Sequence, residues 1–184
     1  TSYWLLREVA RDGVSGKTGI ISSSMFSLAG ICIFLVIAFF TSEQTDADRE
    51  VLFFATLLIP ILFINDALMA INMGFKPHIV SLGKLLLEIL KIPLVITFVY
   101  FLDFGVQGVI LAVVLANIPT AILLAYYGRE KIQNPIKFRF LIKWIKFSWI
   151  SLYPGLNFLF RSIDVLIFSL ITGSVIGLAY YGAA

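Results

Sequence analysis

Two groups of charged side chains lie inside apolar stretches of this sequence, where each charge requires a partner or a function. The first group is in residues 148–173, SWISLYPGLNFLFRSIDVLIFSLITG, with Arg161 and Asp164 near the middle. Asn157, Arg161 and Asp164 follow i, i+4, i+7 spacing, so a helix gathers them on one face. Pro154 precedes them, removes a backbone hydrogen-bond donor and predicts a bend in that helix.

Arg161 is expected to lie deep in a membrane. If its helix begins near Phe147, Arg161 is about 14 residues along it, roughly 20 Å deep and near the bilayer midplane. An uncompensated charge there costs at least about 2.5–3.5 kcal/mol. Two arrangements would offset that cost. Either the polar side chains line a transport cavity, or Arg161 and Asp164 form an ion pair that only holds helices together.

The second group is in the segment GKLLLEILKIP. Lys84, Glu88 and Lys91 repeat the i, i+4, i+7 spacing, so one face of this helix is charged. Lys91 and Pro93 are well inside the apolar run, which favours a buried role for Lys91. Lys84 and Glu88 are equally compatible with a solvated helix end.

A further polar pair, Asn65 and Asp66, follows Pro60 in an apolar stretch. Ala70 and Gly74 continue the row from Asp66 at i+4 and i+8, and small residues allow another helix to approach closely. We therefore expect Asp66 to point into a helix bundle rather than at lipid. The candidate cavity residues are Asn65, Asp66, Lys84, Glu88, Lys91, Asn157, Arg161 and Asp164, and the candidate helix hinges are Pro60, Pro93 and Pro154.

The composition indicates the environment of these residues. Hydrophobic residues make up 60% of 184 positions, charged residues only 14%, and the mean hydropathy is +0.98. A soluble domain cannot bury that much apolar surface, whereas runs of about 20 apolar residues can cross a bilayer as helices. The sequence therefore predicts an all-α, polytopic integral membrane bundle. The expected spans are 19–40, 51–74, 82–102, 106–127 and 147–171, with a sixth from about 175 that the end of the sequence truncates, as in an internal fragment.

Basic residues occur in every second loop between these spans, which predicts the orientation. The loops around Arg7, Lys76 and Arg129 are basic, whereas TSEQTDADRE at 41–50 is acidic. By the positive-inside rule, residues 1–18, 75–81 and 128–146 are cytoplasmic, and 41–50 and 103–105 face outward. The net charge of +3 is dispersed over these loops, so we expect a multi-pass protein of the cytoplasmic membrane and no nucleic-acid partner.

Residues 128–146 are expected to link an N-terminal lobe, 1–127, to the start of a C-terminal lobe, 147–184. After Pro135, Phe138 and Ile142 share one helical side while several cations lie elsewhere. Such a segment lies along the inner leaflet with its cations near anionic headgroups, or it is only a basic flank of the fifth span.

Small residues recur in the fourth span. Gly108, Ala112, Ala116 and Thr120 are spaced by four and predict a smooth ridge for close helix contact. We expect spans 51–74 and 106–127 to pack through their small residues.

Enzymatic signatures are weak. Gly16-Lys17-Thr18 lacks the earlier glycine and the strand of a phosphate-binding loop. With one histidine, His78, and one cysteine, Cys32, the sequence offers no metal-ligand cluster and no Ser–His–Asp arrangement. We expect no catalysis, no cofactor and no metal site.

Three segments carry recognisable motifs: Tyr153-Pro154, RSIDVLIFS and GLAYYGA within 153–183, DFGVQGVILA at 103–112, and NMGFKP at 72–77. These segments resemble polysaccharide flippases of the multidrug/oligosaccharidyl-lipid/polysaccharide exporter superfamily. Residues 153–183 are similar to the seventh span and the start of the eighth in that family. Residues 103–112 resemble its glycine-marked turn into the sixth span, and residues 72–77 resemble its turn between the fourth and fifth.

The resemblance implies a MATE-like, two-lobed transporter that moves a lipid-linked, pyrophosphate-bearing oligosaccharide to the outer leaflet by alternating access. A cationic cavity would match the pyrophosphate, which makes Arg161 and Lys91 the candidates for holding it. Within the same superfamily, a multidrug antiporter driven by H⁺ or Na⁺ would instead use Asp66, Glu88 and Asp164. A non-transport membrane subunit is the third alternative.

Overall fold

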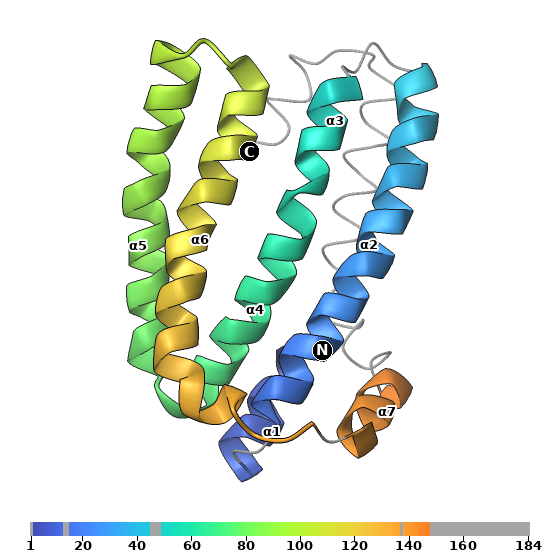
Figure 1. The fold of residues 1–184 in the computed structure, drawn as a ribbon, viewed down its shortest axis with the longest axis vertical. Helices are drawn as coiled ribbons and strands as arrows, with labels where there is room; N and C mark the ends of the chain where they lie inside the picture. Colours follow the sequence, from blue (N-terminus) through green and yellow to red (C-terminus); the bar gives the residue numbers. More distant parts are fainter. Residues whose placement is uncertain (1, 13–14, 45–48, 137, 148–184) are drawn as a thin grey trace, which may run out of the picture. The chain divides into compact units, whose positions relative to one another are not determined.

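Every element that the structure describes is a helix. The computed structural model describes residues 2–12, 15–44, 49–136 and 138–147, and Figure 1 shows their course. The elements are α1 Ser2–Asp12, α2 Gly16–Gln44, α3 Arg49–Thr56, α4 Leu58–Phe75, α5 Pro77–Val95, the π-helix η1 Ile96–Phe101, α6 Gly105–Ile132 and α7 Phe138–Phe147. The prediction of an all-α chain is therefore confirmed for this part of the protein.

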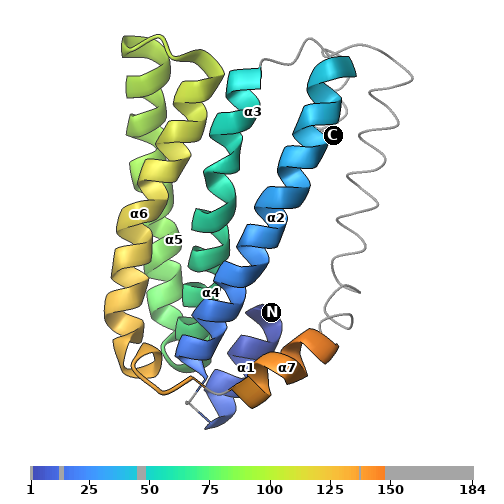
Figure 2. The same cartoon turned by 45° about the vertical axis from the view of Figure 1, so that its right-hand side comes forward.

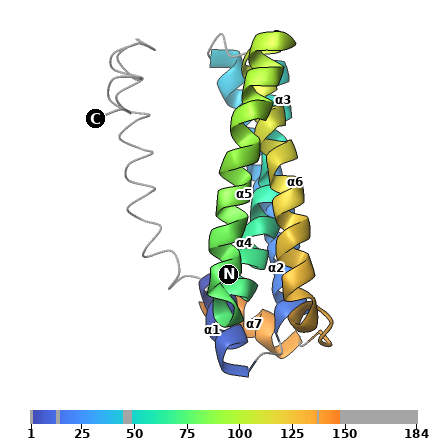
Figure 3. The same ribbon diagram turned by 90° about the vertical axis from the view of Figure 1, so that its left-hand side faces the viewer.

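The chain divides into two units, Thr1–Ile142 and Lys143–Ala184, and the first contains α1 to α6. Within it, α2, α4, α6 and α5 stand side by side in that order (Figures 1 and 2). Among these four, helices that follow one another along the chain run in opposite directions, so the neighbours α4 and α6 are parallel. α5 also touches α4, and α1 packs against α4. Figure 3 views the row from its α5 side.

Among the residues that the structure describes, three helical stretches are long and apolar enough to cross a membrane: Gly16–Phe39, Glu50–Phe75 and Gly105–Ile132. They cover the spans expected at 19–40, 51–74 and 106–127. α5 and η1 cover most of the third expected span, 82–102, but the 19 residues of α5 include Lys84, Glu88 and Lys91. The predicted membrane protein is thus supported by three helices, and α5 differs from them by its charged face.

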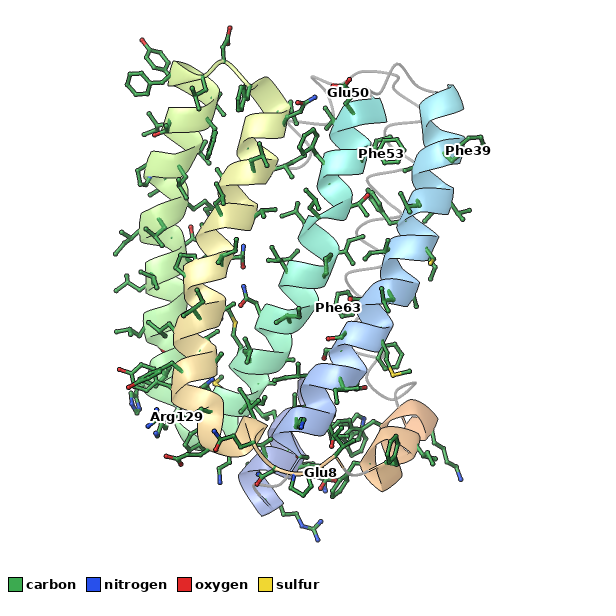
Figure 4. The ribbon with its side chains drawn as sticks, in the orientation of Figure 1. Glu8, Phe39, Glu50, Phe53, Phe63 and Arg129 are labelled. Atoms are coloured by element: carbon green, nitrogen blue, oxygen red, sulfur yellow. The ribbon has the colours of Figure 1, made fainter. Side chains whose placement is uncertain are left out.

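The outer face of α5 indicates lipid contact. Leu85, Ile89 and Ile92 are 57–60% exposed and follow helical spacing along one side. Phe39 and Phe53, on α2 and α3, are likewise about two-thirds exposed, at 60% and 66% (Figure 4). Bulky apolar side chains left open in series are unfavourable in water, so this surface suits hydrocarbon.

Pro60 accounts for a break in the second span. The α-helical hydrogen-bond pattern is interrupted at Leu57, whose amide donates to the Phe54 carbonyl, three residues back, at 3.1 Å, and α4 begins at Leu58. Proline has no amide hydrogen, and its ring clashes with the carbonyl four residues earlier, here that of Thr56. The irregularity at the expected hinge is therefore a local consequence of Pro60.

Pro93 lies inside α5, and the helix widens into η1 three residues later. The carbonyl that Pro93 leaves without its helical donor is that of Ile89, four residues earlier. The Pro93 carbonyl itself accepts a bond from the Thr97 hydroxyl at 2.8 Å. At the end of η1 the Leu102 amide donates to the Thr97 carbonyl, five residues back. Proline and π-turns both interrupt regular helical bonding, so the predicted hinge coincides with a real irregularity.

Two tight turns join α4 to α5 and η1 to α6. Lys76 alone separates α4 from α5, and its amide donates to the Asn72 carbonyl at 2.6 Å. Between η1 and α6 the chain takes positive φ at Asp103 (56°) and Gly105 (52°). Asp and Gly tolerate this left-handed region better than other residues, which explains the Asp-Phe-Gly turn.

Candidate functional site

A pocket of about 340 Å³ opens between α1, α4 and α5. Its lining residues are Leu6 of α1, Asp66, Met69, Ala70 and Met73 of α4, and Val80 and Lys84 of α5. The lining is apolar apart from two side chains of opposite charge. The pocket therefore joins Asp66 and Lys84, which the sequence placed in separate groups.

The turn at Lys76 brings the two charges together. Because α4 and α5 run antiparallel from this turn, Asp66 lies ten residues before it and Lys84 eight residues after it. Asp66 and Lys84 interact electrostatically, and both side chains remain exposed in part. Asp66 thus faces a pocket between helices, but the described residues do not enclose it.

The charged face of α5 continues beyond the pocket. Glu88 and Lys91 form an ion pair one helical turn apart, with side chains 56% and 34% exposed. Together with Lys84 they occupy a face distinct from the apolar stripe through Leu85 and Ile89. Glu88 therefore balances the charge of Lys91 within the same helix. Lys84 is the cation that lines the pocket.

Asn65 does not line the pocket, which differs from its expected place in a cavity. It is only 2% exposed, and its amide donates to the Asn117 side-chain oxygen at 2.6 Å and to the Asn117 carbonyl at 3.3 Å. The Asn117 amide in turn donates to the Val113 carbonyl at 2.7 Å. Asn65 faces α6 because it lies about 100° around α4 from Asp66. Its role is to join two helices.

Asn72 makes a second contact of this kind. Its side-chain amide donates to the Leu124 carbonyl at 2.9 Å and to the Leu68 carbonyl at 2.8 Å, and the residue is fully buried. Asn72 follows Asn65 by seven residues, so both project from the same face of α4. Asn72 was not among the residues predicted from the sequence, although an asparagine seven residues after Asn65 in an apolar span is a signal for this role.

The small-residue ridge of α6 is buried, but the contacts of the small residues on α4 and α6 differ from those expected. Thr120 and the ridge residues Ala112 and Ala116 are fully buried in the described unit. A Cβ at Gly83 of α5 would lie 3.6 Å from the Thr120 methyl group, so part of the ridge faces α5. On α4, a Cβ at Gly74 would meet the backbone of α1 rather than α6. α4 and α6 pack against each other as predicted, and Asn65 and Asn72 form hydrogen bonds across this contact.

The helix α1 was not predicted from the sequence. Its Leu5 and Val9 are buried, and its backbone approaches Gly74 so closely that a Cβ there would lie 3.1 Å from the Ala10 nitrogen. Leu6 then reaches the pocket. The signal was the apolar spacing of Leu5 and Val9 in a short segment that the loop charge marked only as a flank.

The charges of the unit separate between its two ends. Lys17 begins α2, Lys76 joins α4 to α5, and Arg129 lies near the end of α6, all at the end where α1 packs. Glu50 lies at the opposite end, where the Gln107 amide donates to it at 3.2 Å; Figure 4 shows Arg129 and Glu50 at these two ends. This distribution is the one that the loop charges predicted, and the pocket lies toward the basic end.

The other candidate residues, Asn157, Arg161, Asp164 and the hinge Pro154, lie outside the described residues. No family model, curated protein or solved structure matches this chain.

Proposed function

We propose that this protein is a membrane transporter of the flippase type, which moves a lipid-linked oligosaccharide across the cytoplasmic membrane by alternating access. The observation that carries the proposal is the pocket at the basic end, where Asp66 and Lys84 face a space lined otherwise by apolar side chains. Charged groups in membrane-embedded helices are rare, and they typically mark substrate or ion pathways.

The chemistry of the pocket suits an amphipathic anion. Lys84 supplies a cation for phosphate oxygens, while Met69, Met73 and Val80 offer flexible apolar surface for an acyl or polyprenyl chain. Asp66, the other charged side chain of the pocket, has the opposite sign and limits the cost of the Lys84 charge. Lys91, already paired with Glu88, and Arg161 are the further cations proposed for the headgroup path.

Complementation of glycan export in a flippase-deficient cell tests this proposal. Lys84→Gln should abolish most export, and Lys84→Arg should retain part of it because the charge remains. Lys17→Gln, an exposed lysine at the same end but outside the pocket, is the matched control and should export normally at equal expression. Normal export by a well-expressed Lys84→Gln protein would exclude the pocket from the substrate path.

One observation favours a second candidate, an antiporter driven by H⁺ or Na⁺. Asp66 is a carboxylate in a membrane-embedded pocket, and such a group can bind a coupling cation. In that case Asp66→Asn should abolish ion-coupled drug efflux, whereas Lys84→Gln should change it much less. Loss of glycan export with Lys84→Gln and no drug efflux by the unmodified protein would favour the flippase.

A further inference from the structure

We propose that the cytoplasmic ends of α4 and α6 form a binding site for the phosphate group of an anionic phospholipid of the inner leaflet, held by Lys76 and Lys131 around the ring of Phe75. The Lys76 ammonium lies 4.7 Å from the centre of this ring and the Lys131 ammonium 5.5 Å from it. Two cations, one from the turn between α4 and α5 and one from α6, thus converge on one aromatic side chain. This site is separate from the pocket, and the inference does not depend on the transport proposal.

The convergence is built into the packing of the two helices. Asn72 ties α4 to α6 by its bond to the Leu124 carbonyl, one turn before Phe75, and the Asn72 carbonyl accepts the Lys76 amide. At Lys131, the first turn of α2 packs directly against the backbone carbonyl, because Gly16 has no side chain that would collide with it. The backbone positions of both lysines are therefore fixed, and only their side chains need to adapt to a ligand.

The two ammonium groups repel each other, and an anion would relieve that repulsion. Among the described residues neither Lys76 nor Lys131 forms an ion pair with a carboxylate. The aromatic ring attracts each cation, but a ring carries no net charge to balance two. The dipoles of α4 and α6 favour a cation near each helix end, yet they do not require both cations to share one ring.

The depth of the cluster favours a lipid as the source of the anion. Phe75 ends the apolar stretch Glu50–Phe75, and Lys131 is next to the end of Gly105–Ile132. Aromatic rings and basic side chains at the cytoplasmic ends of spans lie at the level of the headgroups. Basic sites between helices at this level bind anionic headgroups, with an acyl chain against the neighbouring apolar surface.

Native mass spectrometry of the purified protein, titrated with phosphatidylglycerol or phosphatidylcholine, tests the site. We expect one phosphatidylglycerol to be retained in preference to phosphatidylcholine. The double variant Lys76→Gln/Lys131→Gln should weaken that binding by about thirtyfold. Each cation contributes about 1 kcal/mol, and about 1.4 kcal/mol corresponds to a tenfold change in affinity. The control, Lys17→Gln with Arg129→Gln, removes the same charge from the same end and should leave the retained lipid in place. Equal loss in both double variants would overturn the proposal in favour of diffuse electrostatic attraction.

Two further arms complete the test. Phe75→Leu keeps both charges but removes the ring that positions them, and it should weaken retention severalfold; unchanged retention would contradict the role of the ring. Glycerol phosphate carries the same anion without acyl chains, so it should not displace the lipid at matched concentration. Displacement at matched concentration would identify a soluble phosphate compound as the ligand and overturn the assignment to a lipid. Circular dichroism and gel filtration of each variant confirm that it folds.

Discussion

Replacing Asn65 by Leu should destabilise the bundle because it removes the central bond between α4 and α6. The Asn65 amide and the Asn117 side-chain oxygen are 2.6 Å apart, and both residues are 2% exposed. Polar bonds between membrane helices contribute about 0.6 kcal/mol on average and up to about 1.7 kcal/mol. The variant also leaves the Asn117 oxygen buried without its donor, and removing one partner of such a bond costs about 1–3 kcal/mol in all. We expect Asn65→Leu to lower the free energy of unfolding by about 2 kcal/mol or more.

A double-mutant cycle isolates the bond. The loss in Asn65→Leu/Asn117→Leu should be smaller than the sum of the single losses by about 0.6–1.7 kcal/mol, because the second change removes the orphaned partner. The assay is reversible unfolding in mixed detergent micelles, followed by circular dichroism. A control cycle of Asn65→Leu with Gln107→Leu, whose amide contacts Glu50, should be additive within about 0.5 kcal/mol. A coupling below about 0.3 kcal/mol for the asparagine pair would refute this account of the α4–α6 contact.

Three other predictions follow from the packing and the charge distribution. Gly74→Leu should lower the melting temperature in detergent and release α1 to proteolysis, because a side chain there meets the α1 backbone; a protected α1 would show that the contact is not tight. Ala116→Leu should also lower the melting temperature, by overpacking a site that is fully buried, whereas Leu115→Ile on the exposed side should not; equal melting temperatures would mean that the ridge faces lipid. In a Cys32→Ser background, a cysteine at Asn134 should react with an impermeant thiol reagent only after the membrane is permeabilised, and labelling on intact cells would reverse the topology.

The sequence predicted the helices well because hydropathy acts locally. Apolar runs of membrane-spanning length mark α2, α4 and α6 without any knowledge of their neighbours. Pro60 and Pro93 likewise mark irregular backbone because a missing amide hydrogen has its effect within one turn. The π-helix after Pro93 could not be predicted from the sequence, because the backbone geometry that a helix adopts after a lost hydrogen bond depends on the helices packed around it.

The contacts between helices were harder to predict. Asn65 and Asn117 are 52 residues apart, and nothing in either local segment shows that their side chains meet. The spacing at Asp66 and at Lys84 identified charged faces, but only the turn at Lys76 places them around one pocket. Small residues indicate that a helix approaches closely without indicating which one, so the row ending at Gly74 was paired with α6 when it contacts α1.

Flipping by the purified protein in proteoliposomes tests the central proposal most directly. A fluorescent lipid-linked oligosaccharide is placed in both leaflets, and an impermeant quencher reports how fast the inner pool reaches the outer leaflet. We predict that the unmodified protein accelerates this exchange, and that Lys84→Gln loses most of the acceleration while Lys17→Gln keeps it. Equal exchange with and without the protein, or an equal rate for Lys84→Gln and the unmodified protein, would contradict a transport role for the pocket between α1, α4 and α5.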